Sequence, residues 1–248
     1  MRWLLDSDIL CFKAATAAEQ EYHWQEDDVW TLLMDMDDAR DAFQTQLEQI
    51  TNALGKGEIL CCFSDPNSNF RKDVDPTYKG GRRKSRKPTG YAALVAWVRD
   101  TYPSAMRPHI EADDLMSIIQ SNPENAGKTI IVSDDKDLLS CPGKLFRPTR
   151  GEKLEISEAD ADRAFLTQVL TGDTADSYPG CPGVGPKTAE KILGSHPSWG
   201  AIEQAFLKAG KTKNDALVQA RLARILRWSD WDSDKGVKLW NPYGTKSL

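Results

Sequence analysis

The chain of 248 residues is long enough for one domain of ordinary upper size, or for one domain with a small addition. Hydrophobic residues make up 40% of it and charged residues 28%, which allows a sizeable core and excludes wholesale disorder. The formal net charge of −5 argues by itself against a nucleic-acid partner, and no apolar run approaches the roughly 18–20 residues of a membrane span.

Apolar runs and helical periodicity alternate over the first 156 residues. Continuous apolar runs of strand length stand at residues 2–5, 58–63 and 129–132. Apolar residues at helical spacing predict helices over residues 39–54, 91–98 and 111–120. Asp37 or Asp38 can cap the first of these helices and Gly55 can end it. The polar stretch that contains Trp24 and Trp30 is assigned no further than a hairpin.

The pattern from about residue 157 onward is entirely helical. Ser157 can cap a helix over residues 158–170, and further helical stretches follow at 186–193, 198–209 and 214–228. Strands spaced by helices predict the α/β class, with a mostly parallel central sheet flanked by helices in residues 1–156. Residues 157–248 would then form a C-terminal helical region that is integral to the same domain.

The cysteines indicate a reduced protein. They are odd in number and show neither a CxxC pair nor the spacing of a zinc site: Cys11, Cys61, Cys62, Cys141 and Cys181. Such usage favours a reducing compartment. Asp6 and Asp8 also interrupt the N-terminal apolar residues too early for a signal peptide, so we expect a soluble, cytoplasmic protein without a membrane partner.

Charge is distributed unevenly along the chain. Residues 71–87 carry eight Lys or Arg against two Asp, residues 183–248 carry eleven against six acids, and residues 19–48 carry ten acids with Arg40 alone. Separate basic and acidic territories predict that a polyanion touches particular faces. Tyr78 could stack on a base or pack inside the protein. The first basic segment supplies the candidate nucleic-acid contacts Arg71, Lys72, Arg83, Lys84, Arg86 and Lys87.

Aspartates follow the three predicted strands: Asp6, Asp65 and Asp135. Each could be an ordinary cap or turn residue, and so could the acids that begin the helix at Glu111. Parallel strands, however, end at one edge of a sheet, where six or more carboxylates would meet. Two charges about 4 Å apart repel by about 4 kcal/mol at an effective dielectric near 20. Such a cluster takes up protons or binds cations, and oxygen ligands without Cys or His suit Mg²⁺ or Mn²⁺.

A glycine turn opens the predicted helix at residue 186. Backbone N–H groups at a helix N-terminus bind phosphate without reading sequence, and Lys187 and Thr188 add donors beside Gly183 and Gly185. We interpret residues 172–193 as a helix-hairpin-helix, a motif that binds DNA.

Several motifs together resemble the flap endonuclease/5′→3′ exonuclease family, particularly its stand-alone phage branch. They run in the family's order from Asp6 to about residue 193: Asp6-Ser7-Asp8, Phe12-Lys13, Phe63-Ser64-Asp65, Phe70-Arg71-Lys72, Tyr78-Lys79, Glu111-Ala112-Asp113-Asp114, Ser133-Asp134-Asp135-Lys136-Asp137 and Gly172-Asp173-Thr174-Ala175-Asp176. The acidic stretch at residues 19–48 resembles only the phage branch, and the Trp-rich tail is left unassigned.

The resemblance implies a site for two divalent ions. The first would be held by Asp6, Asp65, Glu111, Asp113 and Asp114, and the second held or supported by Asp135, Asp137, Asp173 and Asp176. Lys79 would contact the scissile phosphate with Arg82 nearby, and Lys13 stands where many relatives have Arg. Residues 79 to about 105 would form a basic helical arch over single-stranded DNA. The helix-hairpin-helix would also take a monovalent cation.

The expected enzyme is a Mg²⁺-dependent 5′→3′ exodeoxyribonuclease that also cuts 5′ flaps by two-metal phosphodiester hydrolysis, leaving 5′-phosphate products. By analogy it would remove primers or degrade 5′ strands in phage replication, in the cytoplasm of the host. One alternative is a metal-dependent ribonuclease acting on RNA:DNA hybrids, and another is a non-catalytic DNA-binding protein. A calcium-stabilised structural protein is a third. The sequence leaves protein partners unknown.

Overall fold

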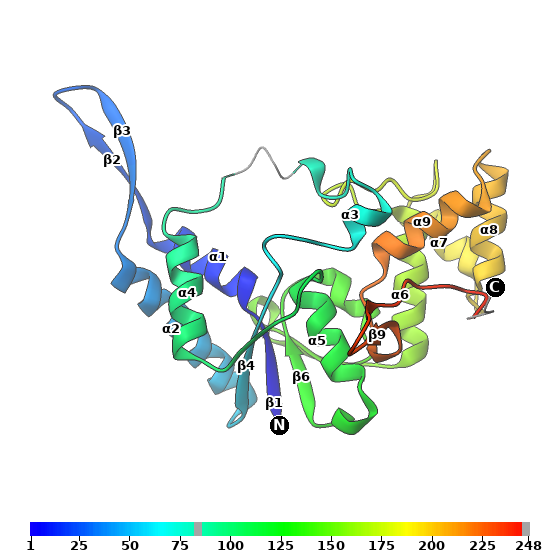
Figure 1. Cartoon of the computed structure of the whole chain (residues 1–248), viewed down its shortest axis with the longest axis horizontal. Helices are drawn as coiled ribbons and strands as arrows, with labels where there is room; N and C mark the ends of the chain where they lie inside the picture. Colours follow the sequence, from blue (N-terminus) through cyan, green and yellow to red (C-terminus); the bar gives the residue numbers. More distant parts are fainter. Residues whose placement is uncertain (82–85, 245–248) are drawn as a thin grey trace.

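A six-stranded sheet forms the centre of the computed structural model, which describes residues 1–81 and 86–244 (Figure 1). The strand order is β5-β4-β1-β6-β7-β8, with every neighbouring pair parallel except the antiparallel pair β7–β8. The strands are β1 (Arg2–Asp6), β4 (Glu58–Phe63), β5 (Ser104–Met106), β6 (Thr129–Val132), β7 (Gly143–Arg147) and β8 (Glu152–Ile156). The predicted class, a mostly parallel sheet flanked by helices, is confirmed.

Both faces of the sheet are covered, which is why its central strands are continuously apolar. Leu4 and Leu5 of β1 are both fully buried, yet they belong to separate hydrophobic clusters on opposite faces. The Leu5 cluster contains helices α1 (Ser7–Ala18), α2 (Met36–Leu54) and α4 (Tyr91–Thr101). The Leu4 cluster contains α5 (Ala112–Ser121) and residues that follow the last helix.

The C-terminal helices surround a third cluster that includes Phe165, Leu170 and Phe206. They are α6 (Glu158–Thr171), α7 (Pro186–Leu193), α8 (Trp199–Lys208) and α9 (Lys213–Ala223). Trp240 packs edge-on against Phe165 and Trp199, so the tail left unassigned from the sequence covers these helices. None of the helices in the described part of the chain is both long and apolar enough to cross a membrane.

Short elements complete the chain. A separate hairpin of β2 (Glu19–Trp24) and β3 (Val29–Met34) matches the hairpin assigned to the polar stretch. The remaining elements are α3 (Arg71–Val74), the 3₁₀ turns η2 (Pro123–Asn125), η3 (Lys136–Ser140), η4 (Pro148–Arg150) and η5 (Trp228–Asp230), and the small pair β9 (Trp231–Asp232) and β10 (Gly236–Val237).

Several sequence-based boundaries need correction. Helix α2 begins at Met36 because Asp35, rather than Asp37 or Asp38, accepts the capping hydrogen bond. Helix α9 ends at Ala223 and not near residue 228, because Arg224 has an extended backbone. Helix α1 and strands β5, β7 and β8 were not predicted. Strands β7 and β8 mix polar with apolar residues, and the apolar residues of α1 are not confined to one face of the helix, so neither a strand nor a helix pattern marks them.

The predicted arch over residues 79–105 is also too long. Leu94 and Val98 of α4 are fully buried in the core, and residues 104–106 form the edge strand β5. Residues 79–81 and 86–90 belong to none of the three hydrophobic clusters, and residues 82–85 of the predicted arch fall outside the described residues.

Candidate metal centre

Acidic side chains meet in one cavity of about 330 Å³ beyond the carboxyl ends of β1 and β6. This is the edge at which parallel sheets bind ligands. Seven of the nine predicted metal-site acids line the cavity, and they come from β1, the start of α5, the turn after β6 and the loop after α6: Asp6, Glu111, Asp113, Asp135, Asp137, Asp173 and Asp176.

Asp6 is the most deeply placed acid of the strand edge, with 6% of its surface exposed. Its Oδ2 accepts a hydrogen bond from the Ser133 hydroxyl at 2.8 Å, and its Oδ1 accepts one from the Ile9 amide at 3.3 Å. Burial, together with the negative charge of Asp8, raises the pKa of Asp6 to about 7 despite the Ser133 bond. A nearby cation would restore the ionised form.

The first turn of α5 contributes a tight group of carboxylates. One oxygen each of Glu111, Asp113 and Asp114 lies within 4.8 Å of the others. Burial acts to raise the pKa of Glu111, but Lys79 and Arg71 outweigh it and hold that pKa at about 2. Burial and the charges of Asp114 and Glu111 raise the pKa of Asp113 well above its usual range. Glu111 is therefore already neutralised by protein cations, whereas Asp113 is not.

The turn after β6 contributes two further acids to the same cavity. Asp135 caps η3 by accepting a hydrogen bond from the Asp137 amide at 2.9 Å, and its own amide donates to Ser133 at 3.1 Å. Burial and the charge of Asp135 raise the pKa of Asp137 to about 6. Lys136 also lines the cavity, and its Nζ lies 3.2 Å from Oδ2 of Asp173.

Two glycines shape the loop that carries Asp173 and Asp176. Gly172 and Gly180 both have positive φ, at 67° and 68°. A Cβ on Gly172 would lie 2.4 Å from the backbone of Pro179, so only glycine allows the two segments to approach. The close approach lets Asp173 and Tyr178 exchange backbone hydrogen bonds, which fixes both acids at the cavity rim.

Lys79 is the predicted catalytic cation that the structure places in the cavity. Its Nζ bonds the Glu111 carboxylate and lies 3.6 Å from Oδ2 of Asp176. Burial would lower the pKa of Lys79, but Glu111, Asp113 and Asp176 outweigh it and leave that pKa raised. The ammonium therefore stays charged.

Tyr78 is a packing residue and not a stacking platform for bases. It is 4% exposed, and its hydroxyl lies 2.9 Å from Glu111 Oε2 and 3.0 Å from Asp176 Oδ2, so that its one proton can be donated to either carboxylate. Its prediction as a DNA contact is wrong, because the ring is enclosed in the C-terminal cluster.

Arg71 is likewise not available to DNA. It is 1% exposed and forms a bidentate pair with Asp114, with N–O distances of 2.7 and 2.8 Å. It also donates to the carbonyls of Leu222 and Arg224. Its predicted DNA contact is therefore wrong: a buried guanidinium needs this full set of partners. Asp114 is fully buried and lies against Arg71, outside the residues that line the cavity.

Two other predicted residues also lie outside the cavity lining. Asp65 accepts hydrogen bonds from the Ser68 hydroxyl and the amides of His109 and Asn67, which hold its pKa at about 2. Lys13 pairs instead with Asp134 at 2.6 Å and lies 3.2 Å from the Thr149 hydroxyl.

The basic segment is only partly described. Lys72 and Lys87 are exposed, and the Lys87 ammonium lies 4.4 Å from the centre of the Tyr91 ring. Arg86 is exposed and forms a two-pronged ion pair with Glu19 at the base of the β2–β3 hairpin, at 2.6 and 2.7 Å. The predicted contacts Arg82, Arg83 and Lys84 lie outside the described residues.

The glycine turn does open a helix. Gly185 caps α7, Pro186 follows at its first position, and Gly183 has a φ of 75°. The four residues predicted to contact DNA here are exposed, so a DNA backbone can reach them: Gly183, Gly185, Lys187 and Thr188.

Sequence reasoning missed two charged residues of the cavity lining, Asp8 and Lys136. Asp8 accepts hydrogen bonds from the Ser64 amide at 2.9 Å and the Tyr91 hydroxyl at 3.3 Å. Both residues stand inside motifs that were recognised, Asp6-Ser7-Asp8 and Asp135-Lys136-Asp137, and spacing from the neighbouring acids could have found them.

Comparison with known proteins decides the family. Residues 2–163 match the N-terminal resolvase-like domain of 5′-3′ exonucleases. The chain belongs to the 5′-3′ exonuclease family. It is 31% identical to the exonuclease of Escherichia phage T7, over 96% of this chain and 93% of that protein. The exodeoxyribonuclease of Enterobacteria phage T3 is also 31% identical, over 96% and 92% of the two chains. As a member of this family, the protein is a nuclease.

Solved structures confirm the fold of this 5′-3′ exonuclease. The phage T5 D15 protein, crystallised with metal ions, superposes with a TM-score of 0.65 at 14% identity, covering 90% of this chain and 89% of its own. The donor set of the cavity independently fits a divalent ion. Its candidate ligands are carboxylate oxygens, with no His or Cys among the described lining residues, and burial together with neighbouring carboxylates raises the pKa values of Asp6 and Asp113.

Proposed function

We propose that this protein is a Mg²⁺-dependent 5′→3′ exodeoxyribonuclease that also cuts 5′ flaps, leaving 5′-phosphate ends. The observation that carries the proposal is the convergence of eight carboxylates, seven of them predicted metal-site acids, and Lys79 in one cavity at the strand edge. Mn²⁺ could replace Mg²⁺, because both prefer oxygen ligands. Its setting would be DNA replication of a phage in the host cytoplasm, with primers or 5′ strands as substrates.

The residues divide into two groups across the cavity. Asp6, Glu111 and Asp113 would hold one ion, and Asp135 and Asp137 a second, supported by Asp173 and Asp176. Divalent ions held there would activate the attacking water and neutralise charge on the leaving 3′-oxygen. Asp65 and Asp114 would act indirectly, since Asp65 holds the turn after β4 and Asp114 holds Arg71.

Lys79 would stabilise the charge that develops on the scissile phosphate. Its ammonium sits among Glu111, Asp113 and Asp176, which keep it protonated. A phosphate entering the cavity would compete with Glu111 for this cation, leaving Glu111 for the first ion. A preorganised cation in a partly buried site acts mainly on the transition state. We assign no phosphate contact to Lys13, because it is engaged by Asp134.

DNA would approach over the exposed basic residues beside the cavity. Lys72, Arg86 and Lys87 are exposed, and Arg82, Arg83 and Lys84 belong to the same basic run of the sequence. The glycine turn and the start of α7 would bind the backbone of the duplex through Gly183, Gly185, Lys187 and Thr188. A monovalent cation at this turn would bind the same phosphate. The helix-hairpin-helix and the short arch remain parts of this proposal.

The decisive assay uses a 5′-end-labelled flap duplex with Mg²⁺, beside an EDTA control, with the labelled products sized. Release of mononucleotides means cutting from the end, and release of the intact flap means cutting at the junction. A matching RNA:DNA duplex tests the alternative of a ribonuclease. Lack of any Mg²⁺-dependent product, with binding retained, would favour the non-catalytic DNA-binding protein.

A further inference from the structure

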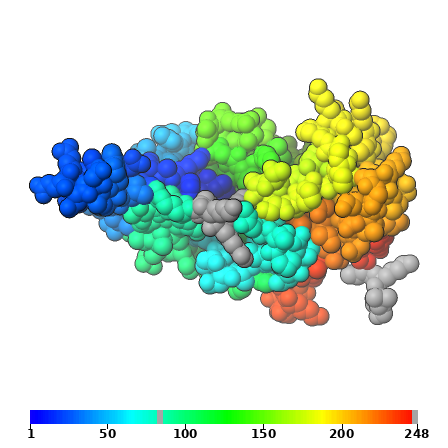
Figure 2. Space-filling model, turned by 90° about the horizontal axis from the view of Figure 1, so that it is seen from above, coloured from blue at the N-terminus to red at the C-terminus, as the bar shows by residue number. Residues whose placement is uncertain are grey.

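The β2–β3 hairpin carries large apolar side chains that no part of the described chain covers. It stands away from the remainder of the molecule at one end (Figures 1 and 2). Strand pairing puts Tyr22, Trp24, Val29 and Leu33 on one face, where each is 47–49% exposed. Trp30, on the other face, is 64% exposed and stacks on His23. Exposed aromatics gathered on a projecting element mark an interaction surface.

The charge of this hairpin restricts what can cover it. Residues 19–34 contain no Lys or Arg and five acids: Glu19, Glu21, Glu26, Asp27 and Asp28. Within the described residues, Glu19 pairs with Arg86 at the hairpin base, and Asp28 pairs with His23 at 2.8 Å. The tip therefore repels phosphate, which disfavours DNA and anionic lipid as occupants. Its counterpart should be apolar with a basic rim.

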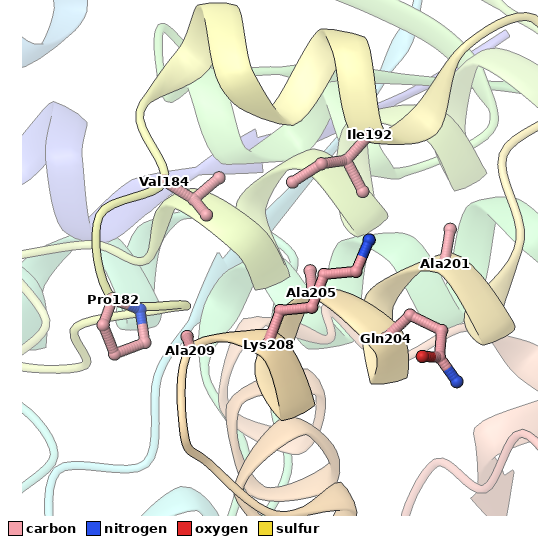
Figure 3. Close-up of a pocket in the computed structure, with 8 residues that line it drawn as sticks. All are labelled: Pro182, Val184, Ile192, Ala201, Gln204, Ala205, Lys208 and Ala209. Carbon is pink, nitrogen blue, oxygen red and sulfur yellow. The ribbon is translucent and has the colours of Figure 1, made fainter.

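A surface of that complementary kind lies between α7 and α8. It is an open pocket of about 520 Å³ lined mainly by apolar side chains, among them Pro182, Val184, Ile192, Ala201 and Ala205. Figure 3 shows Val184 and Ile192 facing Ala205 across the opening, with the ammonium of Lys208 over the same space.

Lysines outnumber acids on the exposed surface of the elements that form the pocket. Lys208 lines it, and the exposed residues of α7 and of the turn after α8 include Lys187, Lys191 and Lys211 against one exposed acid, Glu190. Glu203 of α8 does not cancel this charge, because its carboxylate pairs with Lys213 at 3.0 Å and is buried. The pocket thus offers an apolar floor with positive charge around it, which matches an acidic hairpin with aromatic residues.

We propose that the β2–β3 hairpin of one molecule docks into the α7–α8 pocket of a second copy of this chain. The hairpin and the pocket lie at opposite ends of the molecule, so the hairpin cannot reach the pocket of its own chain (Figures 1 and 2). The contact is heterologous, with different surfaces on the two partners, and it therefore forms rings or open chains. A single hairpin makes a small contact, of the class below about 1,200 Å² that is typical of weak, reversible association.

Sedimentation velocity of the full-length protein without DNA, over a concentration series, tests the proposal. The weight-average sedimentation coefficient of the native protein should rise with concentration and fall back in high salt, which screens the charges. Trp30→Ser and Ala205→Trp, each alone, should remove the self-association. An equimolar mixture of the two variants should form a 1:1 heterodimer and nothing larger, because each retains one intact surface.

Matched variants separate docking from misfolding. Trp228→Ser removes an exposed indole outside the hairpin, and Ala53→Trp adds one to an exposed position of α2, so both should associate like the native protein. Asp27→Lys alters only the hairpin turn and should weaken association even if Trp30→Ser disturbs the strands. Circular dichroism checks that every variant is folded.

The outcomes that overturn the proposal are distinct. A native protein that stays monomeric at all concentrations, or a mixture that stays monomeric, would refute it. Association that survives Ala205→Trp would mean symmetric contact between hairpins, and association that survives both Trp30→Ser and Asp27→Lys would mean contact elsewhere. If a different protein or DNA bound these surfaces and a second copy of the chain did not, the proposed self-association would be refuted. None of these results depends on nuclease activity.

Discussion

The guanidinium of Arg71 and the carboxylate of Asp114 form a bidentate pair in which both side chains are buried, with N–O distances of 2.7 and 2.8 Å. Arg71 also bonds Glu111 at 3.2 Å, and Asp114 accepts from the Leu226 amide at 3.0 Å. One ion pair and its neighbours therefore join α3, the start of α5 and the chain after α9.

Removing one member of this pair should destabilise the whole protein. Arg71→Met leaves Asp114 charged and buried, and breaking such a pair costs about 3–5 kcal/mol. Urea unfolding followed by circular dichroism measures the loss. The neighbouring exposed Lys72→Met is the control and should change the free energy of unfolding by less than about 0.5 kcal/mol. Equal effects of the two variants would contradict the role given to Arg71.

Asp135→Asn should nearly abolish cleavage while DNA binding is kept or strengthened. The substitution removes a carboxylate from the cavity, and with it one ligand charge and some repulsion of the phosphate. Single-turnover cleavage and fluorescence anisotropy, the latter in Ca²⁺, separate the two effects. Unchanged turnover would eliminate the two-metal assignment.

Lys79→Ala should lower single-turnover cleavage by about 30-fold, since one transition-state contact of this kind contributes about 2 kcal/mol or more. Lys56→Ala removes the same charge from an exposed turn before β4, at the opposite end of the sheet, and should leave cleavage unchanged. If Lys79→Ala weakened only the affinity for DNA, Lys79 would be an ordinary backbone contact.

The metal-free protein should become less stable as the pH rises from about 4 to 7. The folded-state pKa values of Asp6, about 7, and Asp137, about 6, lie above that of an unfolded aspartate, so the folded state binds more protons in this window. A pKa difference of one corresponds to about 1.4 kcal/mol. Thermal unfolding in EDTA across this range measures the slope.

Asp6→Asn provides the control for that slope, because of the two carboxyl groups Asp6 has the pKa that is raised further above its ordinary value. The variant should show a flatter dependence on pH than the native protein. Mg²⁺ should stabilise the native protein most at the upper end of the range, where the carboxylates are ionised. A stability that rises with pH in EDTA would contradict these assignments.

The sequence by itself determined the elements whose pattern is local. The apolar runs of β1, β4 and β6 and the periodicity of α2 and α6 followed from residues that face the core, and Ser157 and Gly55 mark helix ends because capping involves neighbours only. The order of the motifs also predicted the family. Most of the acidic cluster was predictable because the carboxyl ends of parallel strands lie at one edge of a sheet.

Only the tertiary structure decided which side chains face the cavity. Arg71 and Tyr78 stand in a basic run, like their exposed neighbours, yet long-range contacts with Asp114 and Glu111 bury them. Asp8 and Asp65 each stand two residues after the end of a strand, β1 and β4. Asp8 nevertheless lines the cavity, whereas the Asp65 carboxylate accepts hydrogen bonds within its own turn. The burial and the hydrogen-bond partners of a side chain depend on residues distant in the chain, so the local sequence pattern does not predict them.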